Sequence, residues 1–356
     1  MPVAPAGSKV LVTGASGFLA VHVVHEALKA GFQVVGTVRS NDKGDYLKQL
    51  FEKQYPGKFS YTIAEDLEAP GAFDEAVKGV KAVLHTASPF HFAAEGKALD
   101  ALVNPAVNGT LSVLNSIKKN GTEVQRVVIT SSFAAIIDST RTPPVDYTEK
   151  DWNESSPANS KRDGNNQDPF DAYRASKTLA ERAAWDFVAK EKPQWDLSTI
   201  NPPFVLGPIL HQVASPDKLN TSVAAIWNLI NGTGKKESDL PGAAGCVVDV
   251  RDVALAHVQA IKVTEAGGER FAPTIGNYTW QGAVDVVHGA PWIPEETKAK
   301  TPKGKTGNYN VTQNNLSGAK TEKVLGVKYH NLQSIIEGGY PAKRPKAVRD
   351  LSEQYR

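Results

Sequence analysis

The chain of 356 residues is long enough to bury a large hydrophobic core, in one large domain or two smaller ones. Its 40 basic and 38 acidic residues leave a formal net charge of only +2, which gives no electrostatic case for a nucleic-acid-binding protein. The single cysteine, Cys246, excludes an internal disulfide. No motif of a catalytic thiol surrounds it, so we expect a small buried side chain.

No segment of the sequence indicates a membrane or secreted protein. The start, MPVAPAGSKV, lacks the charged residues and apolar run of a signal peptide, and no stretch approaches the roughly 18 apolar residues of a membrane span. The one basic run, residues 298–305, contains Pro and Gly and is typical of a solvated loop. We therefore expect a cytoplasmic protein, a monomer or homodimer, that acts on a small molecule and binds neither nucleic acid nor a membrane.

Short apolar strands alternate with helices over the first 200 residues. Strands are expected at 9–13, 32–40, 59–67, 81–88, 125–132 and 196–201, and helices at 21–28, 43–53, 72–77, in a long stretch that ends at 119, and at 168–190. Parallel strands need a crossover connection, which is usually a helix. The alternation therefore predicts an α/β fold with a doubly wound parallel sheet, the Rossmann architecture.

Two parts of the chain are expected to depart from this alternation. Residues 143–168 are rich in Pro, Asn, Ser and Asp, which predicts an irregular loop over the carboxyl edge of the sheet. Beyond Pro202 the pattern changes to loops and short helices, and it returns only at 246–258 and 270–276. We predict a cofactor-binding Rossmann domain made of residues 1–202 plus 246–278. Residues 203–245 plus 279–356 are expected to form a smaller, interleaved C-terminal lobe that binds the substrate.

The first predicted strand leads into the segment TGASGFLA, residues 13–20, and then into a helix. The N–H groups of a helix's first turn are unpaired and partly positive, so they bind an anion if the backbone can approach it closely. Gly14 permits the turn, Gly17 lets the helix start approach a pyrophosphate, and Ala20 lets helix and strand pack closely. The pattern predicts a dinucleotide site, the alternative being a glycine that merely ends a strand.

The end of the second predicted strand favours the phosphorylated dinucleotide. An acidic residue there would bind a ribose 2′-hydroxyl, but residues 37–40 read Thr-Val-Arg-Ser, with Lys43 close behind. Arg39 can bind a 2′-phosphate through two hydrogen bonds, and Lys43 adds a positive charge. We predict NADPH or NADP+ as the cofactor; the alternative is that both residues are ordinary surface cations.

Tyr173 and Lys177 are four residues apart, hence on one face of a predicted helix. An ammonium about 4 Å from a phenol at an effective dielectric of about 20 contributes roughly 4 kcal/mol, which lowers a pKa of ~10 by about 3. The phenol could then exchange a proton with a carbonyl oxygen near neutral pH. Ser132, at the end of the fifth predicted strand, is placed to orient that oxygen, unless the serines there only end the strand.

Taken together, these segments resemble the extended short-chain dehydrogenase/reductases. The resemblance is strongest to the branch of the dihydroflavonol reductases and the fungal methylglyoxal and isovaleraldehyde reductases. It covers about residues 8–340 and depends, in the family's order, on VTGASGFLA, GTVRS, VLHTASPF, PAVNGT, RVVITSSFAA, AYRASK, INPPFVLGP, LNTS and DVRDVALAH. It implies that Tyr173 is the catalytic acid, that Lys177 binds the nicotinamide ribose and lowers the phenol's pKa, and that Ser132 positions the carbonyl.

The resemblance also implies a set of cofactor contacts. They are Thr13, Gly14, Ser16, Gly17, Phe18, Leu19, Arg39, Lys43, Asp66, Leu67, Thr86, Tyr173, Lys177, Pro202, Val205 and Ser222. For Asn108 a proton relay and a buried helix position stay equally open. His85 and His257 are expected to pack rather than react, because neither has metal-ligand spacing around it, and no metal is expected.

These expectations favour an NADPH-dependent reductase, a dehydrogenase of alcohols in the reverse direction, that transfers hydride to an aldehyde or ketone. Phe90, Phe133, Phe204 and Trp227 would line an apolar pocket, which suits a hydrophobic or aromatic carbonyl compound. A nucleotide-sugar epimerase or dehydratase of the same fold is one alternative, but the C-terminal lobe offers no Arg cluster for a second diphosphate. A binding protein that only senses the dinucleotide is another, and it would not need Ser132, Tyr173 and Lys177 together.

Overall fold

The computed structural model describes residues 3–88 and 96–339 of the chain. Its main sheet contains β1 (Lys9–Thr13), β2 (Gln33–Val38), β3 (Phe59–Ile63), β4 (Ala82–His85), β5 (Arg126–Thr130), β7 (Asp196–Ile200) and β10 (Arg270–Phe271). The strands follow the order β10-β7-β5-β4-β1-β2-β3, and every neighbouring pair is parallel. The doubly wound α/β fold is therefore confirmed, and its direction of winding reverses between β1 and β4.

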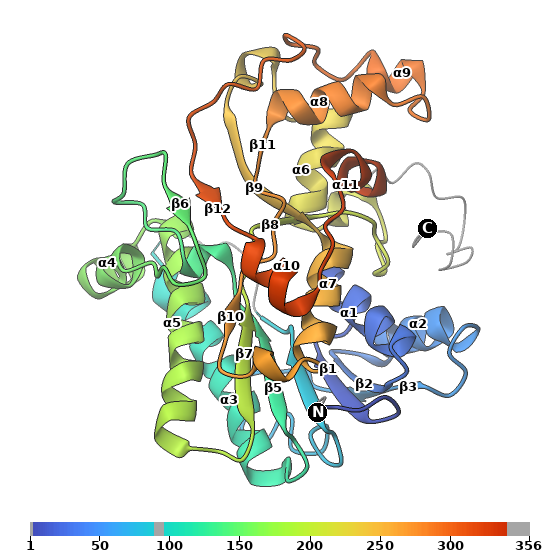
Figure 1. Ribbon diagram of the computed structural model, residues 1–356, viewed down its shortest axis with the longest axis vertical. Helices are drawn as coiled ribbons and strands as arrows, with labels where there is room; N and C mark the ends of the chain where they lie inside the picture. Colours follow the sequence, from blue (N-terminus) through green and yellow to red (C-terminus); the bar gives the residue numbers. More distant parts are fainter. Residues whose placement is uncertain (1–2, 89–95, 340–356) are drawn as a thin grey trace.

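Helices cover both faces of this sheet (Figure 1). One layer contains α1 (Phe18–Lys29), α2 (Asn41–Glu52) and α7 (Val250–Ala260), and the other contains α3 (Asn104–Asn120), which continues a π-helical turn at Leu99–Val103, and α5 (Pro169–Glu191). Along β1, Val10 and Val12 pack into the first layer and Leu11 into the second. The strands read as continuous apolar runs because successive side chains enter two different cores.

A smaller lobe lies beyond the main sheet (Figure 1). It contains a second sheet of β8 (Phe204–Leu206), β9 (Ala243–Asp249) and β11 (Asn277–Thr279), with α6 (Thr221–Ile230), α8 (Trp280–Gly289), α9 (Glu295–Lys298) and α11 (Leu332–Gly339) around it. Its buried residues form a separate hydrophobic cluster. The chain leaves this lobe after β9, contributes α7 and β10 to the main sheet and re-enters at β11, so the two parts are interleaved.

The domain boundaries given above stay a prediction. Residues 246–249 of β9 and residues 277–278 of β11 were assigned to the Rossmann domain, and in the structure they pair within the second sheet. The short helix α10 (Ala319–Leu325), from the C-terminal part of the chain, packs against α7 of the main layer. No helix within residues 3–88 or 96–339 is both long and apolar enough to cross a bilayer.

The prediction of an irregular loop at 143–168 is wrong. This segment contains β6 (Asp146–Tyr147), which pairs with β12 (Asn315–Leu316), then α4 (Ser155–Asp163) and a 3-10 turn at Gly164–Asn166. The carboxylate of Asp138 accepts hydrogen bonds from the N–H groups of Glu154 and Ser155, each at 3.1 Å. The start of α4 is thus capped by a residue distant in sequence, which the composition of the segment does not reveal.

The predicted helix at 72–77 is also wrong, because the segment forms consecutive turns. Its backbone hydrogen bonds mostly reach back three residues, from Ala72 to Ala69, Asp74 to Gly71 and Lys78 to Glu75. Gly71 and Gly79, at φ of +78° and +68°, bound it in conformations that glycine adopts readily. The preceding strand, β3, ends at Ile63 rather than at Leu67.

Candidate active site

The carboxyl ends of β4, β5 and β7 meet around a pocket of about 200 Å³. The pocket lies at the edge where a doubly wound sheet binds its ligands. Its lining contains Leu19, Thr86, Ser88, Thr130, Ser131, Ser132, Tyr173, Lys177, Pro202, Pro203 and Val205. The structure therefore brings seven of the predicted site residues into one cavity: Leu19, Thr86, Ser132, Tyr173, Lys177, Pro202 and Val205.

The turn between β1 and α1 leaves the first turn of the helix without a side-chain cap. Gly17 is the N-cap of α1, no side chain caps that helix, and its first turn contains no acidic residue. Gly14 has φ +64°, and a Cβ added there would lie 3.0 Å from the Cα of Ala87. Ser16 completes the turn, and Phe18 packs edge-on against His22 at 6.0 Å between ring centroids. A dinucleotide's pyrophosphate fits this uncapped helix start, which side chains at the glycines would obstruct.

Thr13, the last residue of β1, joins the turn to the end of β4. Its buried Oγ1 accepts hydrogen bonds from the N–H groups of Thr86 and Ala87, each at 3.1 Å, and lies 2.8 Å from Nδ1 of His85. Burial lowers the pKa of His85 to about 4, so the imidazole is neutral and acts in packing. Thr13 thereby holds Thr86 at the pocket wall.

The helix α5 presents Tyr173 and Lys177 to the pocket. Asp168 caps the helix, because its carboxylate accepts hydrogen bonds from the N–H groups of Phe170 and Asp171, both at 3.0 Å, and Pro169 occupies the first turn. The Tyr173 hydroxyl makes a side-chain hydrogen bond with Ser132. A phenol, a serine hydroxyl and an ammonium thus meet in one pocket.

The expected lowering of the Tyr173 pKa by Lys177 is wrong. Burial raises the pKa of Tyr173, and the hydrogen bond with Ser132 offsets this only in part. Lys177 Nζ lies 5.6 Å from the centroid of the Tyr173 ring and donates a hydrogen bond to Ser88 Oγ at 2.8 Å. Tyr173 therefore keeps its proton at neutral pH, as a proton donor must.

The residues predicted to read the adenosine end lie outside the pocket lining. Arg39 directly follows β2 and is exposed. Lys43, on α2, donates a hydrogen bond to Gln212 Oε1 at 2.7 Å. Asp66 is exposed and accepts a hydrogen bond from the Glu68 N–H at 2.9 Å. Leu67 packs against the α3 side of the core, and Ser222 Oγ accepts a hydrogen bond from Asn220. The roles of all five residues in cofactor binding stay predictions.

The aromatic residues predicted for the substrate pocket are dispersed. Phe90 lies outside the described residues. Phe133 packs edge-on against Tyr147, with 5.8 Å between ring centroids. Phe204 and Trp227 pack against the hydrophobic cluster of the smaller lobe. None of these last three lines the cavity described above, so their contact with a substrate stays a prediction.

Comparison with known proteins decides the family of the chain. The model of the NAD dependent epimerase/dehydratase family matches residues 10–272. The chain belongs to this family of extended short-chain dehydrogenase/reductases. It is 36% identical to a ketoreductase of Aspergillus niger, over 92% of this chain and 95% of that protein. It is 35% identical to the NADPH-dependent methylglyoxal reductase of Saccharomyces cerevisiae, over 92% of this chain and 96% of that protein. The crystal structure of yeast methylglyoxal/isovaleraldehyde reductase complexed with NADPH matches with a TM-score of 0.81 at 33% identity, covering 93% of this chain and 96% of that one.

Sequence reasoning missed several polar residues of this short-chain dehydrogenase/reductase site. Ser88, Thr130 and Ser131 line the pocket. Each follows or ends a strand at the carboxyl edge of the sheet, and this position in the sequence could have identified them as site residues. His257 is buried and contacts Thr130 Oγ1 through Nε2 at 2.7 Å. Glu181 was missed as well, although it continues the spacing of Tyr173 and Lys177 by four more residues.

Two further expectations have clear outcomes, those for Asn108 and Cys246. Asn108 is exposed and donates a hydrogen bond to Glu68 Oε2 at 3.1 Å, so it is neither buried nor part of the pocket. Cys246 is buried, as predicted, and burial raises its pKa to about 11. Within residues 3–88 and 96–339, no three His, Cys, Asp or Glu side chains are grouped as metal ligands would be.

The buried ammonium of Lys177 predicts a pH-dependent stability. Burial lowers its pKa from 10.5 to about 8 in the folded protein. The unfolded chain holds this proton more tightly, so the charge destabilises the fold below pH 8, and this penalty is relieved as the pH rises from about 8 to 10.5. Lys177→Met should therefore raise the free energy of unfolding at pH 7 by about 2 kcal/mol, which is less than the full pKa shift implies because the side chain is half-buried, and by much less at pH 10.5.

Denaturant unfolding of the protein without ligand, at both pH values, measures this difference. The matched control is Lys48→Met, which changes an exposed lysine of α2 and should give no such pH-dependent gain. A stability difference between wild type and Lys177→Met that is equal at the two pH values would contradict the assignment.

Proposed function

We propose that this protein is an NADPH-dependent reductase of aldehydes and ketones, with the pocket beside Tyr173 as its active site. The observation that carries the proposal is that Tyr173, Ser132 and Lys177 line one pocket, in which a side-chain hydrogen bond with Ser132 lowers the pKa of Tyr173 against the effect of burial. The names of the relatives, which include a ketoreductase and NADPH-dependent or NADPH-bound reductases, support the same activity.

The features of the chain fit NADPH at three positions. The uncapped start of α1 would hold the pyrophosphate. Arg39, at the end of β2, would bind the 2′-phosphate, and no acidic residue within 37–40 opposes it. Lys177, Pro202 and the other pocket residues would hold the nicotinamide end. When bound, NADPH supplies the hydride for the carbonyl carbon.

The chain's own residues supply the proton and the orientation. Ser132 Oγ donates a hydrogen bond to the carbonyl oxygen and fixes its direction, and the Tyr173 hydroxyl donates its proton to the same oxygen as negative charge develops there. The raised pKa keeps Tyr173 protonated until that moment. The Ser132 hydroxyl then stabilises the phenolate that remains, through the hydrogen bond that already offsets part of the rise in the pKa of Tyr173.

We infer a hydrophobic or aromatic carbonyl compound as substrate. Leu19, Pro202, Pro203 and Val205 give the cavity an apolar side. A nucleotide sugar would bring a second diphosphate, yet residues 203–245 and 279–339 contain no arginine to bind it. We also propose a cytoplasmic location. The protein is proposed to be a monomer or a homodimer, and gel filtration tests this oligomeric state.

Replacement of Tyr173 by Phe tests the activity. Wild-type protein should oxidise NADPH in the presence of some members of a panel of aldehydes and ketones, followed at 340 nm, and Tyr173→Phe should lower kcat by about 100-fold or more because the proton donor is lost. The matched control is Tyr309→Phe, at an exposed tyrosine of the smaller lobe. Unchanged turnover in Tyr173→Phe would show that Tyr173 is not the catalytic acid. If the wild-type protein reduced no carbonyl compound but converted a nucleotide sugar, the proposed reductase activity would be wrong.

Exchange of Arg39 for Asp tests the choice of cofactor. Arg39→Asp should weaken NADPH binding by about 100-fold and NADH binding much less, because only NADPH presents a phosphate to the lost guanidinium. Isothermal titration calorimetry with both cofactors measures this. Arg162→Asp, at an exposed arginine of α4, is the control. An equal change for both cofactors would show that the 2′-phosphate is bound elsewhere.

A further inference from the structure

A buried ion pair lies beside the pocket. Arg270 Nε on β10 donates to Glu181 Oε1 on α5 at 2.6 Å, and the two side chains are 10% and 0% exposed. Glu181 lies one helical turn beyond Lys177, and therefore on the helix face that carries Tyr173. Neither charge takes part in the proton transfer proposed above, so their burial needs another explanation.

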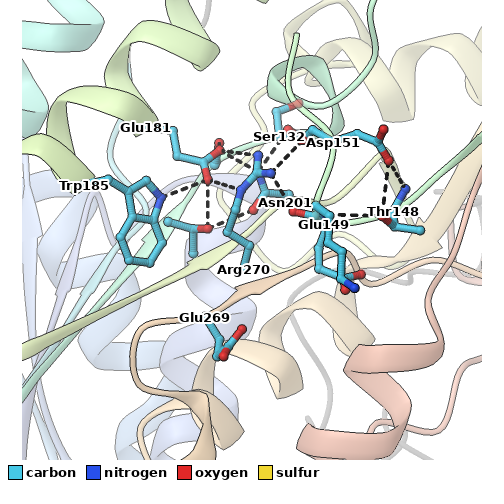
Figure 2. A network of polar contacts seen from close by, with 12 residues as sticks. Ser132, Thr148, Glu149, Asp151, Glu181, Trp185, Asn201, Glu269 and Arg270 are labelled. Atoms are coloured by element: carbon cyan, nitrogen blue, oxygen red, sulfur yellow. Dashed lines mark hydrogen bonds and ion pairs between the residues drawn. The ribbon is translucent and has the colours of Figure 1, made fainter.

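The carboxylate of Glu181 gathers hydrogen bonds from the ends of two neighbouring strands (Figure 2). It accepts from Ser131 Oγ at 2.5 Å, directly after β5, and from Thr199 Oγ1 at 3.0 Å and Asn201 Nδ2 at 2.6 Å, at the end of β7. Trp185 Nε1 adds a further contact at 3.3 Å. One carboxylate thus joins β5 and β7 at the edge of the sheet where the pocket lies.

These hydrogen bonds continue to the pocket wall. Asn201 Nδ2 also donates to the backbone carbonyl of Ser132 at 3.3 Å, and the Phe133 N–H donates to the carbonyl of Pro202 at 2.9 Å. Ser131 directs its hydroxyl to Glu181, while Oγ of the next residue, Ser132, accepts a hydrogen bond from the Ala134 N–H at 3.1 Å and lies beside Tyr173 in the pocket. The anchor on Ser131 therefore fixes the direction of the serine that faces the substrate.

Arg270 secures the opposite side of the network. Its Nη1 donates to the carbonyl oxygens of Glu149 and Asp151 at 2.6 and 2.7 Å, and its guanidinium lies 3.8 Å from the centroid of the Trp152 ring. Figure 2 shows Arg270 between Glu181 and this segment. The pair thus joins α5, the strand ends and the segment before α4 into one rigid unit.

We propose that Glu181 and Arg270 are positioning residues of the reductase, which hold Ser132 and Pro202 in register with Tyr173. This inference rests on the proposed function, because the geometry it protects is that of the carbonyl oxygen. A displacement of about 1 Å at such a site lowers a rate by about 100-fold. Loss of the network should therefore affect kcat through Ser132, and should leave the phosphate turn at α1 unaffected.

A second ion pair, in which the arginine side chain is 1% and the carboxylate side chain 43% exposed, provides a control at the opposite end of β5 and β7. Arg126 pairs with Asp196 at 2.5 Å and joins β5 to β7 at their amino ends, away from the pocket. Asp196→Asn removes one charge from that pair, just as Glu181→Gln does from the pair at the carboxyl ends. Asp196→Asn should change stability without changing kcat in the folded protein.

Hydrogen–deuterium exchange and a double-mutant cycle test the proposal. In Glu181→Gln and in the milder Ser131→Ala, the amides of Ser131 and Phe133 should exchange at least about tenfold faster than in wild type, and in Asp196→Asn they should not. In Ser131→Ala kcat should fall about tenfold with the Kd for NADPH unchanged. In a Ser132→Ala background the same substitution should have little further effect, because the residues act as one unit.

Unchanged exchange of these amides in Ser131→Ala would overturn the inference even if Glu181→Gln does not fold, and this readout does not depend on activity. Additive effects of Ser131→Ala and Ser132→Ala on kcat would overturn it too, since they would assign Ser131 a general structural role. A wild-type protein that reduces no carbonyl compound would instead overturn the proposed function, so the two failures are distinct.

Discussion

Parallel pairing of β1, β4, β5 and β7 is the constraint on which the site depends. Because every strand of the main sheet runs in one direction, residues that follow different strands meet at one edge. Gly14, Thr86, Ser132 and Pro202 follow these four strands directly or within two residues. The reversal of winding between β1 and β4 leaves that edge uncovered by crossover helices, and α5 then brings Tyr173 and Lys177 to it.

Burial determines how these groups behave. In water a phenol and an ammonium titrate near their ordinary values, but in this cavity burial raises the pKa of Tyr173 and lowers that of Lys177 to about 8. Both shifts favour the neutral form of the side chain, because burial disfavours a charge. The Glu181–Arg270 ion pair lies beside them, and its two opposite charges cancel. We infer that it holds the site in place rather than changing the electrostatic potential at Tyr173 and Lys177.

Sequence patterns revealed the features in which neighbouring residues determine the structure. The glycines at 14 and 17, the Asp168-Pro169 helix start and the spacing of Tyr173 and Lys177 each depend on a few consecutive residues, and the structure has them as predicted. The α4 helix was missed because its cap comes from Asp138, distant in sequence.

Long-range contacts account for the other differences. Glu181 and Arg270 meet only because β10 pairs with β7, and nothing local to either residue indicates the other. The direction of the shift in the Tyr173 pKa was mistaken because the spacing of two residues along a helix does not reveal how deeply they are buried. It also does not reveal that Lys177 donates a hydrogen bond to the Ser88 hydroxyl.

We propose that one edge of the sheet brings a bound dinucleotide and a carbonyl oxygen together beside Tyr173. The most direct test is a crystal structure with NADP+ and an unreactive ketone analogue. We expect phosphates at the start of α1 and the analogue's oxygen within hydrogen-bond distance of both Tyr173 Oη and Ser132 Oγ. A structure in which the Tyr173 hydroxyl points away from the analogue, with the nicotinamide outside the pocket, would contradict it.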